Sequence, residues 1–173
     1  MKQLLGAMDA AKRSPFRMWL LNRMLWTGIP FNAPHRLKVV KLDDDAVHIS
    51  IPFKRNNKNH LNGLHACVMA TASEYASGLA LLQKADASRY RLIMQKLEVE
   101  YHAQGRQAAV ATSRISKEEV EREITEPLAS ADSVVYPSKA EVHDLDGRHL
   151  CTATIYWQLK PWDKVRTPKS SQG

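Results

Sequence analysis

The sequence predicts an α+β fold in which a curved antiparallel sheet wraps a long central helix. Residues 64–83 have the pattern of one helix, and their many alanines would let a sheet approach closely. Strand patterns precede and follow this helix, and those in the C-terminal half are separated by short turn signals. A long apolar helix among antiparallel strands is typical of the α+β class.

An extra helical segment is predicted at the N-terminus, over residues 9–28. Ser14-Pro15 is a start signal, because serine caps helices and proline suits the first turn. We expect a broad apolar surface, buried against the domain or a partner subunit, and the alternative is a basic amphipathic helix in weak contact with an anionic membrane surface. The apolar residues are Phe16, Trp19, Leu20 and Met24 on one side and Met18, Leu21 and Leu25 on another.

Six strands are expected, and the first two flank the acidic turn Asp43–Asp45. Gln107–Ser116 follows Gly105 and is expected to form a hairpin with the strand before it. Asp146-Gly147 predicts a hairpin between the last two strands. The six predicted ranges are Arg36–Lys41, Val47–Phe53, Arg91–Ala103, Gln107–Ser116, Ser133–Leu145 and His149–Lys160.

The acidic stretch Lys117–Glu126 predicts a short surface helix.

Two long strands, Arg91–Ala103 and His149–Lys160, each have an alternating pattern that assigns residues to one face. Period-2 alternation indicates a strand with one buried face. The residues expected to share a face are Ile93, Leu97, Val99 and Tyr101 in the first strand and Cys151, Ala153, Ile155, Trp157 and Leu159 in the second.

The 173 residues, with 44% hydrophobic and 25% charged side chains, fit one globular domain with flanking segments. We divide the chain into a basic, apolar helical segment at 1–30, the domain itself at 31–161 and a frayed, flexible tail at 162–173. No apolar run is long enough for a bilayer span, and the N-terminus lacks a secretory pattern. Because two cysteines are too few for a disulfide framework, we expect a cytoplasmic protein.

Positive charge is concentrated at the N-terminus. Residues 1–41 carry eight lysines and arginines against Asp9 alone, and the rest of the chain is neutral, so this segment accounts for the net charge of +7. The basic residues alternate with Trp and Leu at helical spacing, and no nucleic-acid-binding motif accompanies them, so no nucleic acid partner is expected. The histidines have no metal-ligand spacing, and we expect neither a metal nor a cofactor.

The most informative segment joins a polar loop to the central helix. The loop Asn59–Gly63 leads to His65, and the apolar helix that follows contains a single charged side chain, Glu74. A lone carboxylate in such a helix is costly to bury unless it is paired or neutralised. Catalysis is one explanation, and a solvated stripe shared with Thr71 and Ser77 is the other.

Asn59, His65 and Glu74 have spacings that resemble those of the acyl-CoA thioesterases of the phenylacetate-degradation type, which have the hotdog fold. Members of that group carry an Asn, then a His six residues later with two glycines after it, then an acid nine residues beyond the His. The resemblance covers most of residues 30–160. It implies a long central helix in a curved antiparallel sheet.

The sequence also departs from the family pattern at two places near the helix start and the acid, and it has one further similarity to another hotdog branch. Ala66-Cys67 stands where the family has its glycine pair, and the acid is Glu where many members have Asp. Glycine lets a substrate approach the backbone closely, so access to the Ala66 and Cys67 amides is expected to be tighter. Arg55-Asn56 and Glu74–Gly78 are similar to an uncharacterised hotdog branch that is labelled only as a domain of unknown function.

The resemblance implies hydrolysis of an acyl-CoA or acyl-carrier thioester. Glu74 would be the general base for water, or the attacking nucleophile. The backbone N–H groups of Ala66 and Cys67, at the helix N-terminus, would hold the negative charge that develops on the carbonyl oxygen. Thr71 would contact the substrate, although filling the helix is its more ordinary role.

Asn59 would orient the water or the thioester, and His65 would support the helix start. The ordinary roles of these two residues are a turn former and a helix cap. His65 and Glu74 lie on opposite sides of an ideal helix, so a site with both parts has to be shared between subunits. A homodimer or a dimer of dimers is therefore expected, as in hotdog thioesterases.

Two other functions use the same fold. A non-catalytic hotdog domain that binds acyl-CoA or lipid is favoured by the altered glycine pair, and binding without turnover would identify it. Hydratase or dehydratase chemistry normally goes with a longer loop containing Pro and Gly between the His and the acid, which this sequence lacks.

Overall fold

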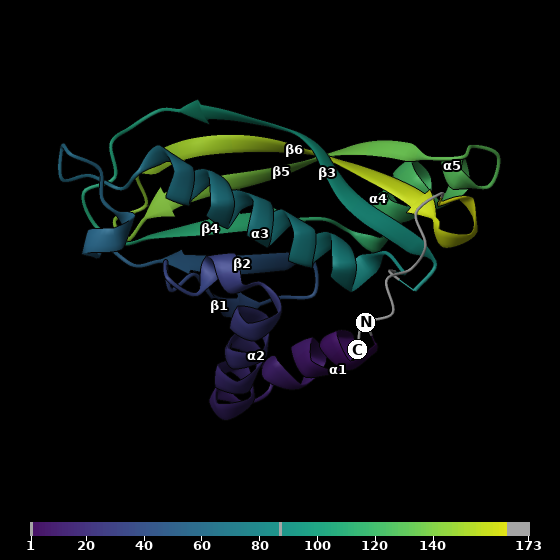
Figure 1. The fold of residues 1–173 in the computed structure, drawn as a ribbon, viewed down its shortest axis with the longest axis horizontal. Helices are drawn as coiled ribbons and strands as arrows, with labels where there is room; N and C mark the ends of the chain where they lie inside the picture. Colours follow the sequence, from purple (N-terminus) through teal and green to yellow (C-terminus); the bar gives the residue numbers. More distant parts are fainter. Residues whose placement is uncertain (1, 87, 166–173) are drawn as a thin grey trace.

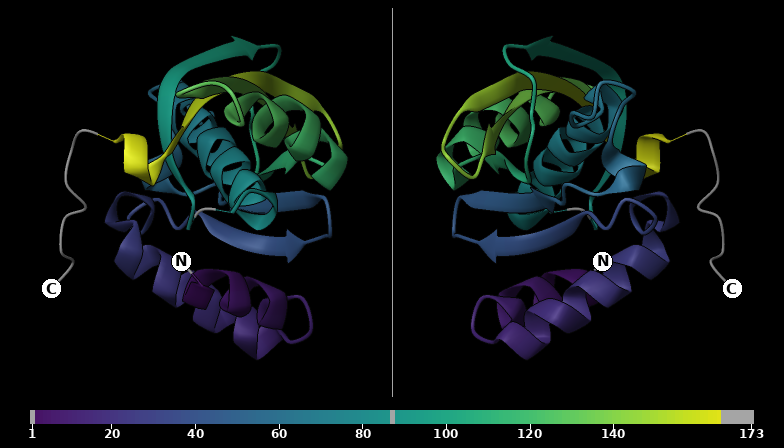
Figure 2. Two further views of the ribbon diagram at one scale, coloured as in Figure 1. Left: turned by 90° about the vertical axis from the view of Figure 1, so that its right-hand side faces the viewer. Right: turned by 90° about the vertical axis from the view of Figure 1, so that its left-hand side faces the viewer.

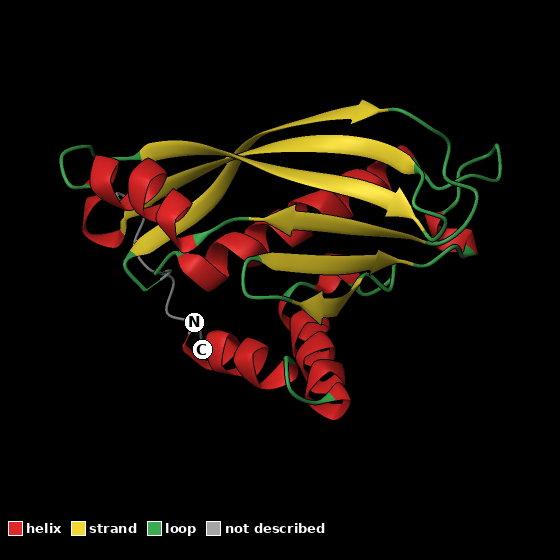
Figure 3. Ribbon diagram, turned by 180° about the vertical axis from the view of Figure 1, so that it is seen from behind, coloured by secondary structure: helices red, strands yellow, loops and turns green. Residues whose placement is uncertain are grey.

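The computed structural model describes residues 2–86 and 88–165. A long helix, α3 (Ala66–Lys84), lies against one face of a six-stranded antiparallel sheet, and Figure 3 shows the strands in front of that helix (Figures 1 and 3). The strand order is β1-β2-β4-β5-β6-β3, which confirms the predicted α+β architecture. The strands are β1 Lys38–Leu42, β2 Ala46–Ile51, β3 Tyr90–Tyr101, β4 Ala109–Arg114, β5 Val134–Asp144 and β6 His149–Pro161.

Small side chains and one tryptophan fix α3 to the sheet. Ala72 and Ala76 are fully buried, which lets the strands approach the helix backbone. The indole Nε1 of Trp157, on β6, donates a 2.7 Å hydrogen bond to the Ser77 hydroxyl. A Cβ at Gly78 would lie 3.2 Å from the same indole ring, so glycine provides the space that the ring occupies.

The predicted hairpin between Arg91–Ala103 and Gln107–Ser116 is wrong. β4 pairs with β2 and β5, whereas β3 pairs with β6 and forms one edge of the sheet. The connection passes the start of α3, where the Leu64 N–H donates to the Gly105 carbonyl at 2.7 Å. A Cβ at Gly105 would lie 2.9 Å from the side chain of Leu150, so glycine marks this close crossing and not a tight turn.

The predicted face of β3 is also wrong in part. The pairing of β3 with β6 shifts register between Met94 and Lys96, which is the signature of a β-bulge. A bulge reverses the alternation, so Leu92 packs on the core before it and Leu97 after it. Ile93 is consequently exposed, although it has the same parity as Leu97.

Two local predictions are confirmed. β5 and β6 form a hairpin through Gly147, whose φ of 81° lies in the left-handed region that glycine tolerates. The predicted inward face of β6 is buried, from Cys151 to Leu159. The acidic stretch is helical, in α4 Lys117–Val120, the π-helix η3 Glu121–Thr125 and α5 Glu126–Leu128. Three 3-10 turns lie elsewhere in the described residues: η1 Pro30–Asn32, η2 Arg55–Asn57 and η4 Trp162–Lys164.

The predicted tail begins at residue 162, but Trp162–Lys164 form the turn η4. The Trp162 N–H donates to the Arg89 carbonyl, and Lys164 forms an ion pair with Asp132 at 2.7 Å. Residues 166–173 of that predicted tail lie outside the described residues.

The N-terminal segment forms two helices, α1 (Lys2–Ala11) and α2 (Pro15–Gly28), outside the sheet and next to β1 (Figure 2). The amide of Asn22 forms two hydrogen bonds with the backbone of Val39, one as donor at 2.9 Å and one as acceptor at 2.7 Å. Trp26 Nε1 donates to the Leu37 carbonyl at 2.6 Å. α2 thus satisfies the backbone of an edge strand that otherwise invites unwanted pairing.

We predict that Asn22→Ala lowers the free energy of unfolding by about 2 kcal/mol, because a buried N–H and a buried C=O of Val39 both lose their partner. Urea denaturation of the variant and the wild type would measure this loss in the free energy of unfolding. Asn56→Ala is the matched control, since Asn56 is exposed and forms no side-chain hydrogen bond within the described residues. Equal losses in the two variants would contradict the proposed strand-edge role of Asn22.

Candidate active site

The loop before α3 is held by asparagines. The buried amide of Asn57 donates to the carbonyls of His35 and Pro52, and its oxygen meets the His35 ring at 3.0 Å. The Asn57 carbonyl accepts the N–H of His65, which ties this anchor to the helix start. The Asn59 side-chain oxygen accepts the N–H groups of residues 61 and 63, each at 3.0 Å, so in this chain Asn59 shapes the turn.

At the start of α3, one backbone donor is occupied and another is available. His65 is the N-cap, and its Nδ1 accepts the Cys67 N–H at 3.1 Å. Ala66 is the first helical residue, and its N–H meets no acceptor among the described residues. The carbonyl of Ala66 accepts the Tyr101 hydroxyl at 2.9 Å, which links the helix start to the end of β3. The available donor at this positive helix end is therefore the Ala66 amide.

Glu74 lies in the middle of α3 and is partly buried. Burial raises the pKa of its carboxyl group above the ordinary glutamate value. Within the described residues the carboxylate has neither a hydrogen bond nor an ion pair. Thr71, one turn earlier, is also partly buried, whereas Ser77 is fully buried and accepts the bond from Trp157. The stripe through Glu74 is thus not a solvated helix face, because Ser77 belongs to the core.

The structure brings only some of the predicted site residues together. His65, Ala66 and Cys67 meet at the N-terminus of α3, and Asn59 lies in the loop that leads to them. Glu74 lies nine residues beyond His65, which is about 13 Å along the axis of a regular α-helix and on its opposite side. One chain therefore contains the two parts of the expected site, but does not join them.

Tyr101 is a site residue that sequence reasoning missed. Its hydroxyl donates a hydrogen bond to the Ala66 carbonyl. Burial is the main cause that raises the pKa of the phenol, and the neighbouring thiols of Cys151 and Cys67 raise it further. The available signal was a tyrosine at the end of a long strand. Alternation placed this side chain on the face of Leu97 and Val99, but the partner of its hydroxyl depends on how α3 packs beside the end of β3.

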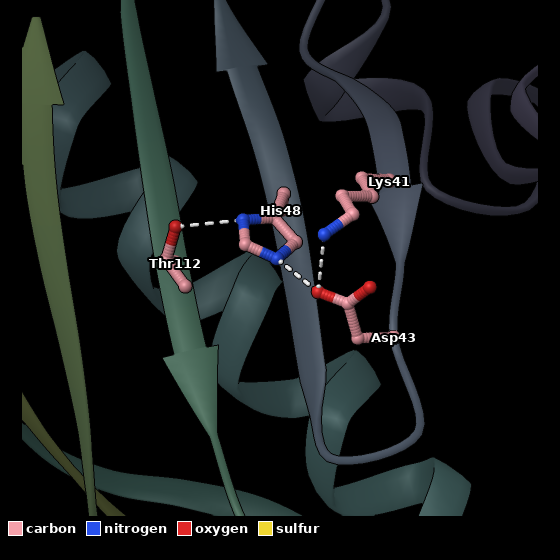
Figure 4. A network of polar contacts seen from close by, with 4 residues as sticks. All are labelled: Lys41, Asp43, His48 and Thr112. Atoms are coloured by element: carbon pink, nitrogen blue, oxygen red, sulfur yellow. Dashed lines mark hydrogen bonds and ion pairs between the residues drawn. The ribbon is translucent and has the colours of Figure 1, made fainter.

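A second polar cluster lies on the outer face of the sheet (Figure 4). His48 joins Thr112 Oγ1 through Nδ1 and Asp43 through Nε2, each at 3.0 Å, and Lys41 donates to the same carboxylate oxygen at 2.9 Å. Hydrogen bonds from Lys41 and then His48 hold the pKa of Asp43 below its ordinary value. The order of hydroxyl, imidazole and carboxylate is that of a hydrolase triad.

This outer cluster lacks the other half of a hydrolytic site. Residues 111–113 of β4 are paired with β2 on one side and with β5 on the other, so their amides serve the sheet and leave no donors for an oxyanion. The cluster therefore ties β1, β2 and β4 together. The described residues contain no group of histidines, cysteines and carboxylates arranged to hold a metal ion.

Comparisons with known proteins agree with this architecture. A protein of unknown function from Pseudomonas aeruginosa, described as a probable thioesterase, is 18% identical and superposes with a TM-score of 0.74 over 81% of this chain and 93% of its own. A thioesterase from Haemophilus influenzae (10% identity, TM-score 0.63) matches over 83% and 90% of the two chains. A thioesterase variant from Staphylococcus aureus is 13% identical and superposes with a TM-score of 0.60, over 76% of this chain and 99% of its own.

These likenesses establish the fold, which is the predicted hotdog fold. No curated protein matches the sequence. Among the described residues no helix is long and apolar enough to cross a membrane. A family model, the domain of unknown function DUF4442, matches residues 17–159. The chain therefore belongs to the DUF4442 family, which is described as a domain of unknown function.

Proposed function

We propose that this protein is a thioesterase that hydrolyses acyl-CoA or acyl-carrier thioesters. The observation that supports this most is Glu74, a partly buried carboxylate without a partner in the described residues and with a raised pKa. A carboxylate in such surroundings is a suitable base for water near neutral pH. The thioesterase descriptions of the structural neighbours point to the same reaction class.

In the proposed reaction, Glu74 takes a proton from water, and the oxygen of that water attacks the thioester carbonyl. The Ala66 N–H stabilises the resulting oxyanion. Collapse of the tetrahedral intermediate breaks the C–S bond, and the leaving thiolate takes the proton from Glu74. Direct attack by the Glu74 carboxylate, giving an anhydride that water then cleaves, is the second version of the same proposal.

The site is proposed to form between two subunits of a homodimer or a dimer of dimers, because Ala66 and Glu74 of one chain do not meet. β3 is suited to the contact. It is an edge strand of twelve residues, and Ile93 and Met94 are exposed on it. A long edge strand with exposed apolar side chains is a ready pairing surface, and pairing about a two-fold axis would cover it.

The remaining predicted residues have supporting roles in this proposal. His65 holds the helix start, Asn59 closes the turn that leads to it, and Thr71 lines the acyl pocket one turn from Glu74. A cytoplasmic location is proposed with it, and the free thiols of Cys67 and Cys151 suit that compartment.

One observation favours a second candidate function, acyl-CoA or lipid binding without turnover. The Cys67 N–H, which the sequence predicts as a second oxyanion donor, instead donates to the His65 ring at 3.1 Å. A site with one available donor stabilises an oxyanion less than a site with two. Tight binding of acyl-CoA with no thiol release would favour this alternative.

We predict that Glu74→Gln lowers kcat for thiol release by about a hundredfold or more, because the amide cannot accept the proton from water. The measurement is thiol release from short, long and aromatic acyl-CoAs. Glu126→Gln, which alters an exposed carboxylate elsewhere, is the control and should retain full activity. Turnover unaffected by Glu74→Gln would remove Glu74 from the mechanism.

Ala66→Pro tests the oxyanion donor. Proline removes the Ala66 N–H yet fits the first position of a helix, and His65 already has the extended backbone, with ψ of 137°, that precedes a proline. We predict that kcat falls by about a hundredfold while the melting temperature stays the same. Ala66→Ser keeps the amide and should remain active. Equal activity in the two variants would rule out the Ala66 amide.

The raised pKa of Glu74 also predicts an effect on stability. Below the ordinary glutamate pKa, the side chain is neutral in both the folded and unfolded states. As the pH rises through the higher folded pKa, burial of the charge lowers the free energy of unfolding. Near neutral pH, Glu74→Gln should therefore be more stable than the wild type by about 1 kcal/mol.

Urea denaturation across this pH range would measure the difference between the two proteins. It should disappear in acid, below the ordinary glutamate pKa. A Glu74→Gln variant that is less stable than the wild type at neutral pH would indicate that the carboxylate is paired.

A further inference from the structure

The outer face of α2 carries large apolar side chains that nothing in the described chain covers. Phe16 is 69% exposed and Trp19 57%, and their rings stack with centroids 5.9 Å apart. Leu20 and Met24 continue the same face and are also exposed. The inner face, with Leu21, is buried. Of the two apolar sides predicted from the sequence, one therefore packs against the domain and the other is exposed. A cluster of this kind on a surface helix indicates a binding surface.

Positively charged side chains surround this cluster. Arg13, Arg17 and Arg23 are exposed and form no ion pair with the described residues. Lys38 and Lys41, on β1, line a groove of about 820 Å³ between α2 and that strand. The nearby carboxylates are engaged, as Asp43 pairs with Lys41 at 2.9 Å and Asp44 with Lys12 at 3.1 Å. The surface therefore presents a net positive potential.

We propose that the outer face of α2 docks the protein on an anionic phospholipid surface. Phe16, Trp19, Leu20 and Met24 enter the boundary between headgroups and acyl chains, and the arginines contact lipid phosphates. Aromatic and aliphatic residues on one side of a helix with arginines at the margin are the features of interfacial helices. The helix lies in the plane of the membrane surface, because its fourteen residues are too few to span it.

The charges favour lipid over a second copy of the chain. A two-fold contact through this face would bring Arg13, Arg17 and Arg23 of both copies together without any carboxylate among them. The face is also separate from Glu74, because α2 packs on β1 and not on α3. The proposal therefore stands independently of thioesterase activity.

The test is sedimentation of the full-length protein with vesicles of phosphatidylcholine alone and of phosphatidylcholine with about one third phosphatidylglycerol. We expect binding to the anionic vesicles that weakens as salt is added. Arg17→Glu with Arg23→Glu should reduce binding by about tenfold or more, since each basic residue near the surface contributes to attraction. Phe16→Ser with Trp19→Ser should reduce binding by a similar factor.

Matched controls are chosen from β5 and its turn to β6, which two strands separate from β1. Leu145→Ser removes an equally exposed apolar side chain, and Lys139→Glu with Arg148→Glu reverses two exposed charges. These variants should bind as the wild type does. Every altered residue is exposed, and thermal melts of all variants would check that the fold is kept.

Three results would overturn the proposal. The first is absence of binding to anionic vesicles, and the second is equal binding to neutral and anionic vesicles. The third is loss of binding in the control variants to the same extent as in the α2 variants. If the α2 substitutions instead change the oligomeric state measured by light scattering and leave vesicle binding unchanged, the surface joins two copies of the chain.

Discussion

The close fit between α3 and the sheet is the constraint on which the rest of the structure depends. Alanines at the contact let the strands curve around the helix, and Trp157 fixes its rotation through the bond to Ser77 and the contact at Gly78. Once that rotation is set, Glu74 has to lie on the strip that the sheet does not fully cover. Packing and site are therefore two consequences of one interface.

The electrostatics of α3 follow from this placement. A partly buried carboxylate without a partner destabilises the fold, which natural proteins tolerate where the group has a function. The Ala66 amide lies at the positive end of the same helix and has no acceptor among the described residues, so it is complementary to a developing negative charge. Because Ala66 and Glu74 lie a little over two turns apart, neither suffices alone, and a second subunit supplies the missing half in the proposed dimer.

α2 connects the domain with its surroundings through its two sides. On the inner side, Asn22 and Trp26 satisfy the backbone of β1, which holds the helix in a fixed orientation. On the outer side, Phe16 and Trp19 are exposed between arginines. The anchoring explains how a helix with an apolar outer face keeps that face in solvent without collapsing onto the sheet.

The sequence by itself determined the elements whose cause is local. These are the central helix, predicted at residues 64–83 and found at Ala66–Lys84, and the hairpin at Gly147, together with the placement of His65 at the start of that helix and Glu74 within it. The tertiary structure decided what depends on distant partners. It paired β4 with β2 and β5, reversed β3 at its bulge, and turned Tyr101 to Ala66. It also gave the Cys67 amide to His65. Spacing fixes which residues share an element, but strand order and hydrogen-bond partners follow from packing the whole chain.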